Sequence, residues 1–347
     1  MDRPSILIIK LSSVGDIVMA TPAVHQLKCH TNARIVWAID EGIAPLLRGH
    51  PDVDELLLFP RDPFRFPTFD PFRVVPKAAH TVVKLRRDYF DAALDLQGRG
   101  RTYLLLQLAR ARIKIGRGSF PLLARAIPHN RHIQRHAVET NLEALEMLNV
   151  PVPERPALTL PAVAGDRKRV EGFLSELGIR RDFAVLLPGG TWPSKRWPAR
   201  HWAELSQWLR MEKLDVVLAG SRAEAALGTR ITSLLQDATG VFSAFGSLSL
   251  RELYHLLDLS LLVVSGDTGP LHIAAATRTP LVALYGPTDP LRTGPWPPGR
   301  AEVVTAPGCT QCRMPHCSRG CMKLLYPCAV TQAVMSIRSG AQQAIRA

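Results

Sequence analysis

The stretch "LIIKLSSVGDIVMATPAV", residues 7–24, decides the expected fold. It opens with an apolar run that stops at Lys10, continues through a turn of small residues, and reaches Asp16 where a helix begins. A buried strand that leads through such a turn into a helix is the first half of a βαβ unit, the building block of parallel sheets. Ligands of these sheets bind at the carboxyl ends of strands, so the turn itself is a candidate site.

Short apolar runs of the same kind recur along the chain, most of them ending in a turn that contains glycine. They are "RIVWAID" (34–40), "ELLLF" (55–59), "AALDLQG" (92–98), "FAVLLPGG" (183–190), "DVVLAGS" (215–221), "LSLLVVSGDTG" (259–269) and "PLVALYGPT" (280–288). A proline-rich stretch at 149–169 separates two sets and is typical of an interdomain connection. We therefore expect an α/β protein with two doubly wound, Rossmann-like domains facing each other across a cleft.

The composition excludes several classes of protein. Of 347 residues, 46% are hydrophobic and 21% charged, which is a globular balance. No apolar run approaches the ~20 residues that span a bilayer, and the N-terminus lacks a signal-peptide pattern, so we expect a cytoplasmic protein. The net charge of +13 indicates an anionic partner: nucleic acid, a membrane surface or a phosphorylated ligand.

Part of this charge is concentrated in residues 99–135, which contain nine Lys or Arg and no Asp or Glu. Hydrophobic residues run through the same stretch, which favours a folded basic face over a tail. Such a face can bind an anion or can simply be solvated, and the sequence leaves both alternatives open.

The dinucleotide fingerprint G-x-G-x-x-G and the P-loop follow none of the expected strands. Two other turns offer phosphate contacts instead. "PGGTWPSKRW" (188–197) contains Thr191 and Lys195, and "SGDTGPLH" (265–272) provides small residues, a hydroxyl and a helix start. Together they predict a nucleotide-diphosphate site, although Asp267 or Thr268 could equally be a helix cap.

Asp16 has two interpretations. A carboxylate at the start of a helix commonly caps it. If a sugar diphosphate binds in the second domain, the same carboxylate could take a proton from an incoming hydroxyl as a general base. Ser12, Ser13 and Gly15 would form the tight turn that presents it.

At this point the motifs resemble glycosyltransferase family 9, the ADP-heptose:lipopolysaccharide heptosyltransferases. The resemblance covers nearly the whole chain. It rests on six motifs in family order: "KLSSVGDIVMATPAV", "DLQG", "RHAVETNLEAL", "PGGTWPSKRWPARHWAEL", "GDTGPLHIAAA" and "LYGPTDP".

The resemblance implies a GT-B fold. Residues 1–160 would form the acceptor domain and residues 161–328 the nucleotide-sugar domain, with a last helix at 329–347 that crosses back to the first domain. It also implies inverting transfer of heptose from ADP-L-glycero-β-D-manno-heptose, with Asp16 as the base. The residues that it implicates in donor binding are Thr191, Lys195, Glu224, Asp267, Thr268, Gly269 and His272. No cofactor is expected, although Mg²⁺ could lie beside Asp267 near the diphosphate.

The implied acceptor is the acidic inner core of lipopolysaccharide, either Kdo-lipid A or the first heptose. Arg99 and Arg101 could meet this acceptor, and the basic face could contact the inner membrane surface. A monomer is expected by analogy. A family 9 enzyme with another sugar or acceptor is the alternative, and a basic nucleic-acid-binding protein ranks last because no nucleic-acid-binding motif is present.

Five of the six cysteines lie between residues 309 and 328. Cys309, Cys312, Cys317 and Cys321 have spacing typical of a metal site, and a cytosolic chain does not normally hold disulfides there. The resemblance implies a comparable loop before the last helix with no catalytic role. We expect no metal, and a metal site at these cysteines remains the alternative.

Overall fold

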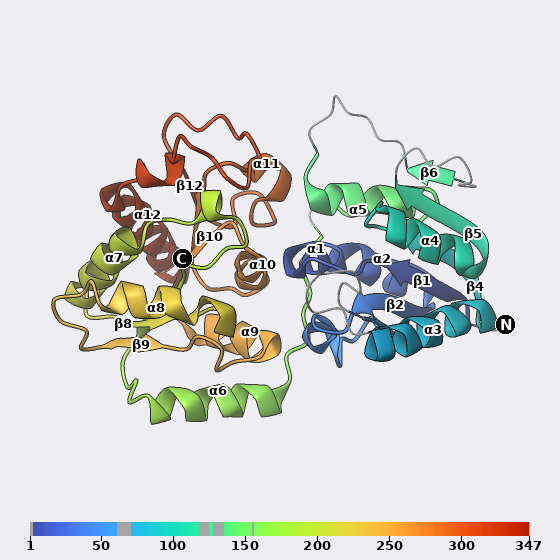
Figure 1. The fold of residues 1–347 in the computed structure, drawn as a ribbon, viewed down its shortest axis with the longest axis horizontal. Helices are drawn as coiled ribbons and strands as arrows, with labels where there is room; N and C mark the ends of the chain where they lie inside the picture. The colour runs from blue at the N-terminus through green and yellow to red at the C-terminus, as the bar shows by residue number, and fades with distance from the viewer. Residues whose placement is uncertain (1–2, 61–70, 118–124, 128–134, 155, 347) are drawn as a thin grey trace. The chain divides into compact units, whose positions relative to one another are not determined.

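The computed structural model describes residues 3–60, 71–117, 125–127, 135–154 and 156–346. The chain divides into two compact units, Met1–Pro161 and Ala162–Ala347. Each unit contains one six-stranded sheet, and every strand pair in both sheets is parallel. Helices lie on both sides of each sheet (Figure 1).

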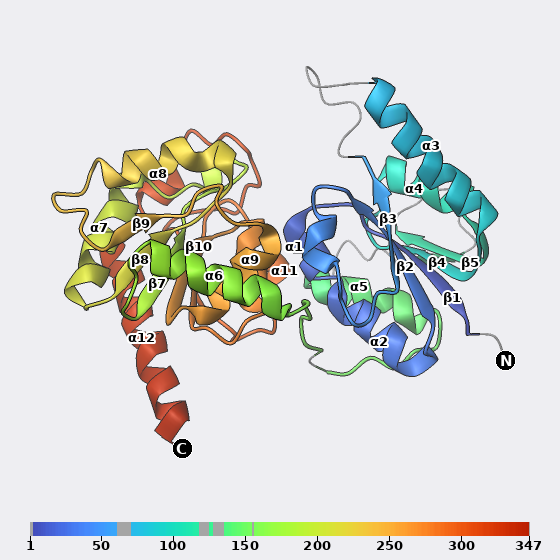
Figure 2. The ribbon, with the colours of Figure 1, turned by 90° about the horizontal axis from the view of Figure 1, so that it is seen from below.

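The sheet of the first unit has the order β3-β2-β1-β4-β5-β6. Its strands are β1 (Ser5–Ile9), β2 (Arg34–Asp40), β3 (Glu55–Phe59), β4 (Tyr89–Asp95), β5 (Arg110–Arg117) and β6 (Arg125–Ile127). The helices of this unit are α1 (Val14–Val18), α2 (Thr21–Thr31), η1 (Ala44–Leu47), α3 (Pro71–Arg87), α4 (Gly100–Leu108) and α5 (Ala137–Glu146). Figure 2 shows α3 and α4 on one side of the sheet and α2 and α5 on the other.

The second unit repeats this topology, with the order β12-β11-β10-β7-β8-β9. Its strands are β7 (Phe183–Leu187), β8 (Asp215–Leu218), β9 (Val241–Ser243), β10 (Leu262–Gly266), β11 (Leu281–Tyr285) and β12 (Glu302–Thr305). Its helices are α6 (Ala164–Glu176), η2 (Pro193–Lys195), α7 (Ala199–Met211), η3 (Arg222–Glu224), α8 (Ala225–Thr232), α9 (Leu250–Leu259), α10 (Gly269–Ala275), α11 (Pro290–Thr293), η4 (Cys321–Lys323) and α12 (Pro327–Arg346).

In both units the chain builds one half of the sheet outward from its first strand and then returns to build the other half. The order therefore reverses between β1 and β4 in the first unit and between β7 and β10 in the second. Loops leave in opposite directions at such a point, which opens a crevice at the carboxyl ends of the two strands. The expected doubly wound α/β fold is confirmed, and each crevice is the place in its unit where such sheets commonly bind a ligand.

Four strands were not recognised in the sequence: β5, β6, β9 and β12. β5 alternates arginine or lysine with alanine and isoleucine, which is a strand pattern of period two. It lacks the continuous apolar run by which the central strands were recognised. The helix α6 also begins inside the stretch that the sequence analysis assigned to the connection.

The buried side chains of the central strands form the cores. Leu7, Ile9, Val36 and Ala93 belong to the core of the first unit, while Leu186, Val264 and Val282 belong to that of the second. α12 packs against α7, β11 and β12, and its Val330 is fully buried. No helix in the described ranges is long and apolar enough to cross a membrane.

Candidate functional site

The crevice of the second unit brings together the two phosphate-type turns that the sequence predicted. Ser265 of β10 pairs in register with Leu187 of β7, so the loops that follow these strands leave the sheet at the same level. The loop after β7 contains Thr191 and Lys195, and the loop after β10 contains Asp267.

Lys195 and Asp267 form an ion pair across this crevice. The Nζ of Lys195 donates to Oδ2 of Asp267 over 2.6 Å, and the two side chains are 18% and 7% exposed. The Thr288 hydroxyl donates to the same Oδ2 over 2.5 Å. The Lys195 ammonium also lies 4.7 Å from the ring centroid of Trp192. The ammonium is thus held at the crevice by two neighbours and retains N–H donors for an anion.

Trp197 explains the spacing of the K-x-W motif. Its indole is buried in the core and its Nε1 donates to the Leu325 carbonyl over 2.6 Å. Lys195 comes two residues earlier, at the end of η2. The tryptophan therefore anchors the loop to the core while the lysine side chain reaches the crevice.

Thr268 is the N-cap residue of α10, but its side chain does not cap the helix. Its Oγ1 is buried and has no hydrogen-bond partner in the described part of the chain. Pro270 removes one amide from the first turn, and the Leu271 amide donates to the Thr268 carbonyl. The helix start thus offers fewer amides than the motif suggests. The hydroxyl of Thr268 is the donor that a ligand would satisfy, with Gly269 beside it and His272 buried within α10.

Glu224 holds the turn after β7. Its Oε1 accepts from the Gly190 amide over 2.8 Å, and its Oε2 accepts from the amide and hydroxyl of Ser221 over 3.0 and 2.7 Å. Burial acts to raise the pKa of Glu224, but these hydrogen bonds outweigh it and lower the pKa. A Cβ at Gly189 would lie 2.2 Å from the carboxylate, so only glycine allows this approach.

The first unit has a cavity of about 630 Å³ at its own crevice, where the loops after β1 and β4 leave the sheet. Basic and polar side chains form its walls. They are Lys10, Ser12, Ser13, Asp16, Gln97, Arg99, Arg101 and Arg117. Four cations surround one carboxylate here, which makes the cavity suited to an acidic ligand.

Asp16 both caps a helix and lines this cavity. It is the third residue of α1, and its Oδ2 accepts from the amide and the hydroxyl of Ser13, each over 2.9 Å. Gly15 is buried beneath it. The two interpretations of Asp16 are therefore compatible, because a capped carboxylate can still face a ligand.

Lys10 lines the same cavity as Asp16 and is 4% exposed. Its Nζ donates to the Leu96 carbonyl and to Oδ1 of Asn141, over 2.9 and 3.2 Å. Burial lowers the pKa of Lys10 to about 8, with the charge of Arg117 adding to the effect and that of Asp16 opposing it. An anion in the cavity would favour the charged ammonium.

Arg117 reaches the cavity from the end of β5. Its Nη2 donates to Asn141 over 3.1 Å, while its buried Nε has no partner among the residues described. Gly98 has a φ of +67°, and a Cβ there would lie 2.6 Å from the Cβ of Arg117. The glycine of the "DLQG" turn thus lets β5 bring its arginine into the crevice.

The two arginines named from the sequence also line the cavity. Arg101 donates to the Ser12 hydroxyl over 3.3 Å, and Arg99 is the N-cap residue of α4. Gln97 accepts from the Leu11 amide over 2.7 Å and shapes the turn after β1. The rest of the predicted basic face lies partly outside the described residues, at 118–124 and 128–134.

The sequence did not predict Lys10, Gln97 or Arg117 as site residues. Lys10 and Gln97 stand inside quoted motifs, directly after strands, and that position was the available signal. Arg117 carried no such signal because β5 itself was missed.

A model of the family described as glycosyltransferase family 9 (heptosyltransferase) matches residues 80–323. The chain belongs to glycosyltransferase family 9. Lipopolysaccharide heptosyltransferase 1 of Escherichia coli strain K12 is 27% identical over 321 residues, which cover 90% of this chain and 94% of that protein. Lipooligosaccharide heptosyltransferase 2 of Haemophilus influenzae strain Rd is 29% identical over 306 residues, covering 84% of this chain and 86% of that protein.

Among solved structures, E. coli heptosyltransferase WaaC with ADP has a TM-score of 0.76 and 25% identity to this chain. The match covers 96% of this chain and 99% of that one. The family 9 resemblance noted from the sequence is confirmed, as is its GT-B fold. The protein is thus a glycosyltransferase of the lipopolysaccharide core heptosyltransferase family.

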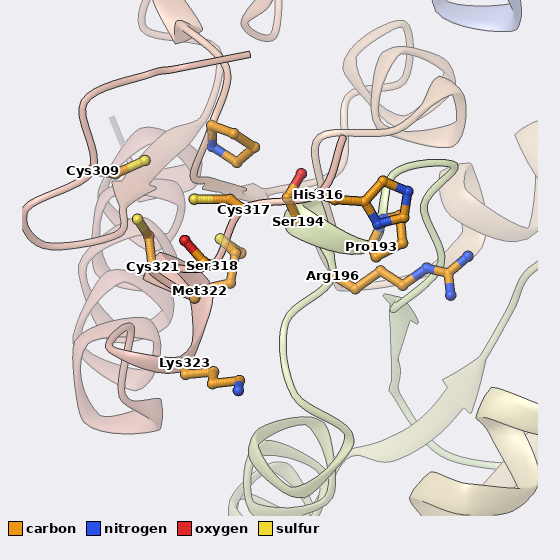
Figure 3. Close-up of a pocket in the computed structure, with 12 residues that line it drawn as sticks. Pro193, Ser194, Arg196, Cys309, His316, Cys317, Ser318, Cys321, Met322 and Lys323 are labelled. Carbon is orange, nitrogen blue, oxygen red and sulfur yellow. The ribbon is translucent and has the colours of Figure 1, made fainter. Parts of the chain in front are cut away.

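In this family 9 chain the cysteine-rich segment lies beside the loop that carries Lys195. Both regions line a second cavity, of about 490 Å³ (Figure 3). Pro193, Ser194 and Arg196 form one wall, and Cys309, Cys317 and Cys321 lie on the other. No local pattern in the sequence indicates that these two regions lie side by side.

Proposed function

We propose that this glycosyltransferase transfers heptose, with inversion, from ADP-L-glycero-β-D-manno-heptose to the acidic inner core of lipopolysaccharide. The observation that carries the proposal is the Lys195–Asp267 ion pair at the crevice of a doubly wound sheet. The Thr268 hydroxyl next to it has no hydrogen-bond partner among the residues that the structure describes. A cation and a hydroxyl donor at that place suit a diphosphate.

In this proposal the second unit binds the donor. Lys195 directs its remaining N–H donors to the diphosphate, and the hydroxyls of Thr191 and Thr268 add hydrogen bonds. Asp267 and Thr288 keep the ammonium in place. Glu224 lies where it could accept from the ribose while it holds the Gly190 amide. These contacts would stabilise the negative charge that grows on the leaving ADP.

The first unit binds the acceptor. The inner core of lipopolysaccharide carries carboxylates and phosphates, and the four cations around the cavity of this unit complement them. Lys10 and Arg117 would contact the acceptor from behind, while Arg99 and Arg101 would do so from α4.

The reaction follows from these two sites. An acceptor hydroxyl gives its proton to the carboxylate of Asp16 as its oxygen attacks the anomeric carbon of heptose. The bond between that carbon and the β-phosphate oxygen breaks, and ADP leaves with the electron pair. Since attack comes from the face opposite to ADP, the anomeric configuration inverts. We propose that no Mg²⁺ takes part, because Lys195 already provides the positive charge beside Asp267.

We further propose that residues 1–160 and 161–328 are the acceptor and donor domains, that the helix at 329–347 crosses back to the first, and that the enzyme is a monomer. It would act in the cytoplasm, against the inner leaflet of the inner membrane. The net charge of +13 supports this contact with an anionic surface.

Purified protein mixed with ADP-heptose and Kdo-lipid A tests the proposal. Mass spectrometry should find a product heavier by one heptose, with ADP released in equal amount. A parallel reaction with heptosyl-Kdo-lipid A shows which core position is used. Release of a nucleoside diphosphate only from other nucleotide sugars would favour the alternative of a family 9 enzyme with another donor. No transfer to either core acceptor would overturn the acceptor assignment.

A further inference from the structure

The segment between β12 and η4 contains four cysteines in the spacing C-x₂-C-x₄-C-x₃-C. They are Cys309, Cys312, Cys317 and Cys321. Residues 306–320 form turns and irregular backbone only, and a loop of this length inside a compact domain usually has a function or a fixed anchor. Two pairs of closely spaced cysteines are the common pattern of a structural tetrathiolate metal site.

The thiols lie close together in the fold. Figure 3 shows the sulfur atoms of Cys309, Cys317 and Cys321 turned toward one another in the cavity beside the Lys195 loop. All four are free thiols. Three of the four thiols thus line one cavity, and Cys312 lies on the same segment five residues before Cys317.

The four residues also differ in how firmly they are held. Cys321 is buried in the hydrophobic core and Cys309 packs against that core, whereas Cys312 is exposed. No three His, Cys, Asp or Glu side chains in the described ranges already form a metal-ligating group. Rotation of the exposed Cys312 side chain and small movements of its loop would bring a fourth thiol to the three that line the cavity, two of which are held by the core.

We propose that Cys309, Cys312, Cys317 and Cys321 bind one thiophilic divalent cation, Zn²⁺ or Fe²⁺, as a structural site of this family 9 chain. Four thiolates provide the tetrahedral sulfur set that both ions accept. The site is distinct from the donor and acceptor crevices and takes no part in bond making.

The contacts of the same segment explain what such a site would do. The Ser194 amide donates to the Pro315 carbonyl over 3.2 Å, and the Ser194 hydroxyl donates to the Met314 carbonyl over 2.6 Å. The Arg313 amide donates to the Pro287 carbonyl over 2.8 Å. Ser194 precedes Lys195, and Pro287 precedes Thr288.

The residues between Cys312 and Cys317 therefore support the two loops that carry Lys195 and Thr288, the partners of Asp267. An ion bound to the four thiolates would fix these backbone contacts. It would thereby set the position of the Lys195 ammonium in the donor crevice.

Metal analysis of the full chain, purified under reducing conditions, tests the site. The protein is stripped with a chelator, reconstituted with Zn²⁺ and passed through a desalting column. We expect one Zn²⁺ retained per chain, a rise in melting temperature on reconstitution, and the visible absorption of tetrahedral Co²⁺-thiolate when Co²⁺ replaces Zn²⁺. Cys312→Ser should lose retention, because its side chain is exposed and its replacement should not disturb the core.

Cys328→Ser is the matched control, since Cys328 is an exposed cysteine outside the spacing pattern. It should retain Zn²⁺ like the wild type. The proposed metal site is contradicted if the reconstituted wild type retains no more Zn²⁺ than Cys312→Ser. It is equally wrong if all four thiols react freely with a thiol reagent after reconstitution, or if mass spectrometry finds them paired as disulfides.

The effect of the bound ion on the donor crevice is measured separately. This part of the proposal rests on the proposed function. ADP affinity, measured by calorimetry, should fall several-fold in the stripped protein and recover with Zn²⁺. Zn²⁺ retention with unchanged ADP affinity would overturn the link and leave the metal site standing. Loss of ADP binding in every form, with Zn²⁺ retained, would instead count against the donor assignment.

Discussion

The Nζ of Lys195 lies 2.6 Å from Oδ2 of Asp267, and this pair joins the loops that leave β7 and β10. If the ammonium also binds the donor diphosphate, Lys195→Met should weaken ADP binding. A hydrogen bond to a charged group contributes about 1.5–3 kcal/mol, which corresponds to a roughly ten- to hundredfold higher Kd. Calorimetric titration with ADP measures this change.

The same variant leaves Asp267 without its cation and should lower the melting temperature. In Lys195→Met combined with Asp267→Asn, the melting temperature should recover while ADP affinity stays low. Recovery of ADP affinity in the double variant would show that Lys195 acts on Asp267 alone.

Asp16→Asn tests the general base. Because the amide has a similar shape but cannot take the proton, kcat should fall by about 10²–10⁴-fold with ADP affinity unchanged. Ser13→Ala is the matched control, since it removes one hydrogen bond to Asp16 and keeps the carboxylate. It should destabilise α1 by about 1 kcal/mol and lose far less activity. Full transfer by Asp16→Asn would leave the residue with a capping role only.

Lys10 should make acceptor binding depend on pH. Burial lowers its pKa to about 8, so the ammonium that would meet an acidic acceptor loses its proton above that pH. The KM for Kdo-lipid A should rise as pH increases through about 8, while ADP affinity should not follow it. In Lys10→Met the KM should be high at every pH. A wild-type KM that stays flat across this range would remove Lys10 from the acceptor site.

The same pKa predicts the direction of a stability change. Between about 8 and 10.5 the unfolded chain still binds the Lys10 proton and the folded chain does not, so this residue makes the protein more stable as pH rises. Denaturant unfolding of the wild type and Lys10→Met should diverge in that window. If the free energies of unfolding of the two proteins changed in parallel with pH, the lowered pKa of Lys10 would be contradicted.

Glu224→Gln should destabilise the turn after β7. Glutamine cannot accept on its amide nitrogen, so at least one donor among Gly190 and Ser221 loses its partner, at a cost of about 1–3 kcal/mol. The pKa of Glu224 is below its ordinary value of 4.5. The carboxylate therefore contributes fully to the free energy of unfolding above that pH. This contribution is lost as pH falls through the lower pKa that Glu224 has in the folded state. Urea unfolding at neutral and acidic pH should show the gap between the variant and the wild type close in acid.

Transfer should proceed equally with and without added Mg²⁺. Asp267 is already bound by Lys195 and Thr288, and an added Mg²⁺ would have to displace them. Initial rates with and without Mg²⁺, in buffer free of chelator, make the comparison. A rate that requires Mg²⁺ would assign Asp267 to metal binding.

The sequence predicted the central strands well because buried parallel strands are continuous apolar runs. β2 and β3 begin and end where "RIVWAID" and "ELLLF" do. β5 could not be recognised in this way, since this strand has charged residues at its exposed and half-buried positions. The turn residues Lys195 and Asp267 were predictable from their places after strands.

The crevice of the first unit was harder to predict. Arg117 reaches it only because β5 lies beside β4, and that order follows from topology and not from local pattern. Likewise, no local signal places Ser194 against Met314, since 120 residues separate them along the chain.

The two sheets share no strand. The last strand of the first sheet, β6, ends at Ile127, and the first strand of the second sheet, β7, begins at Phe183. Parallel strands pair residues that are far apart in sequence and therefore fold slowly. During synthesis, however, the first sheet can form while the second is still on the ribosome, because domains generally fold as units from the N-terminus. The ribosome thus separates in time two sheets of the same strand order, which lessens the chance that strands of one insert into the other.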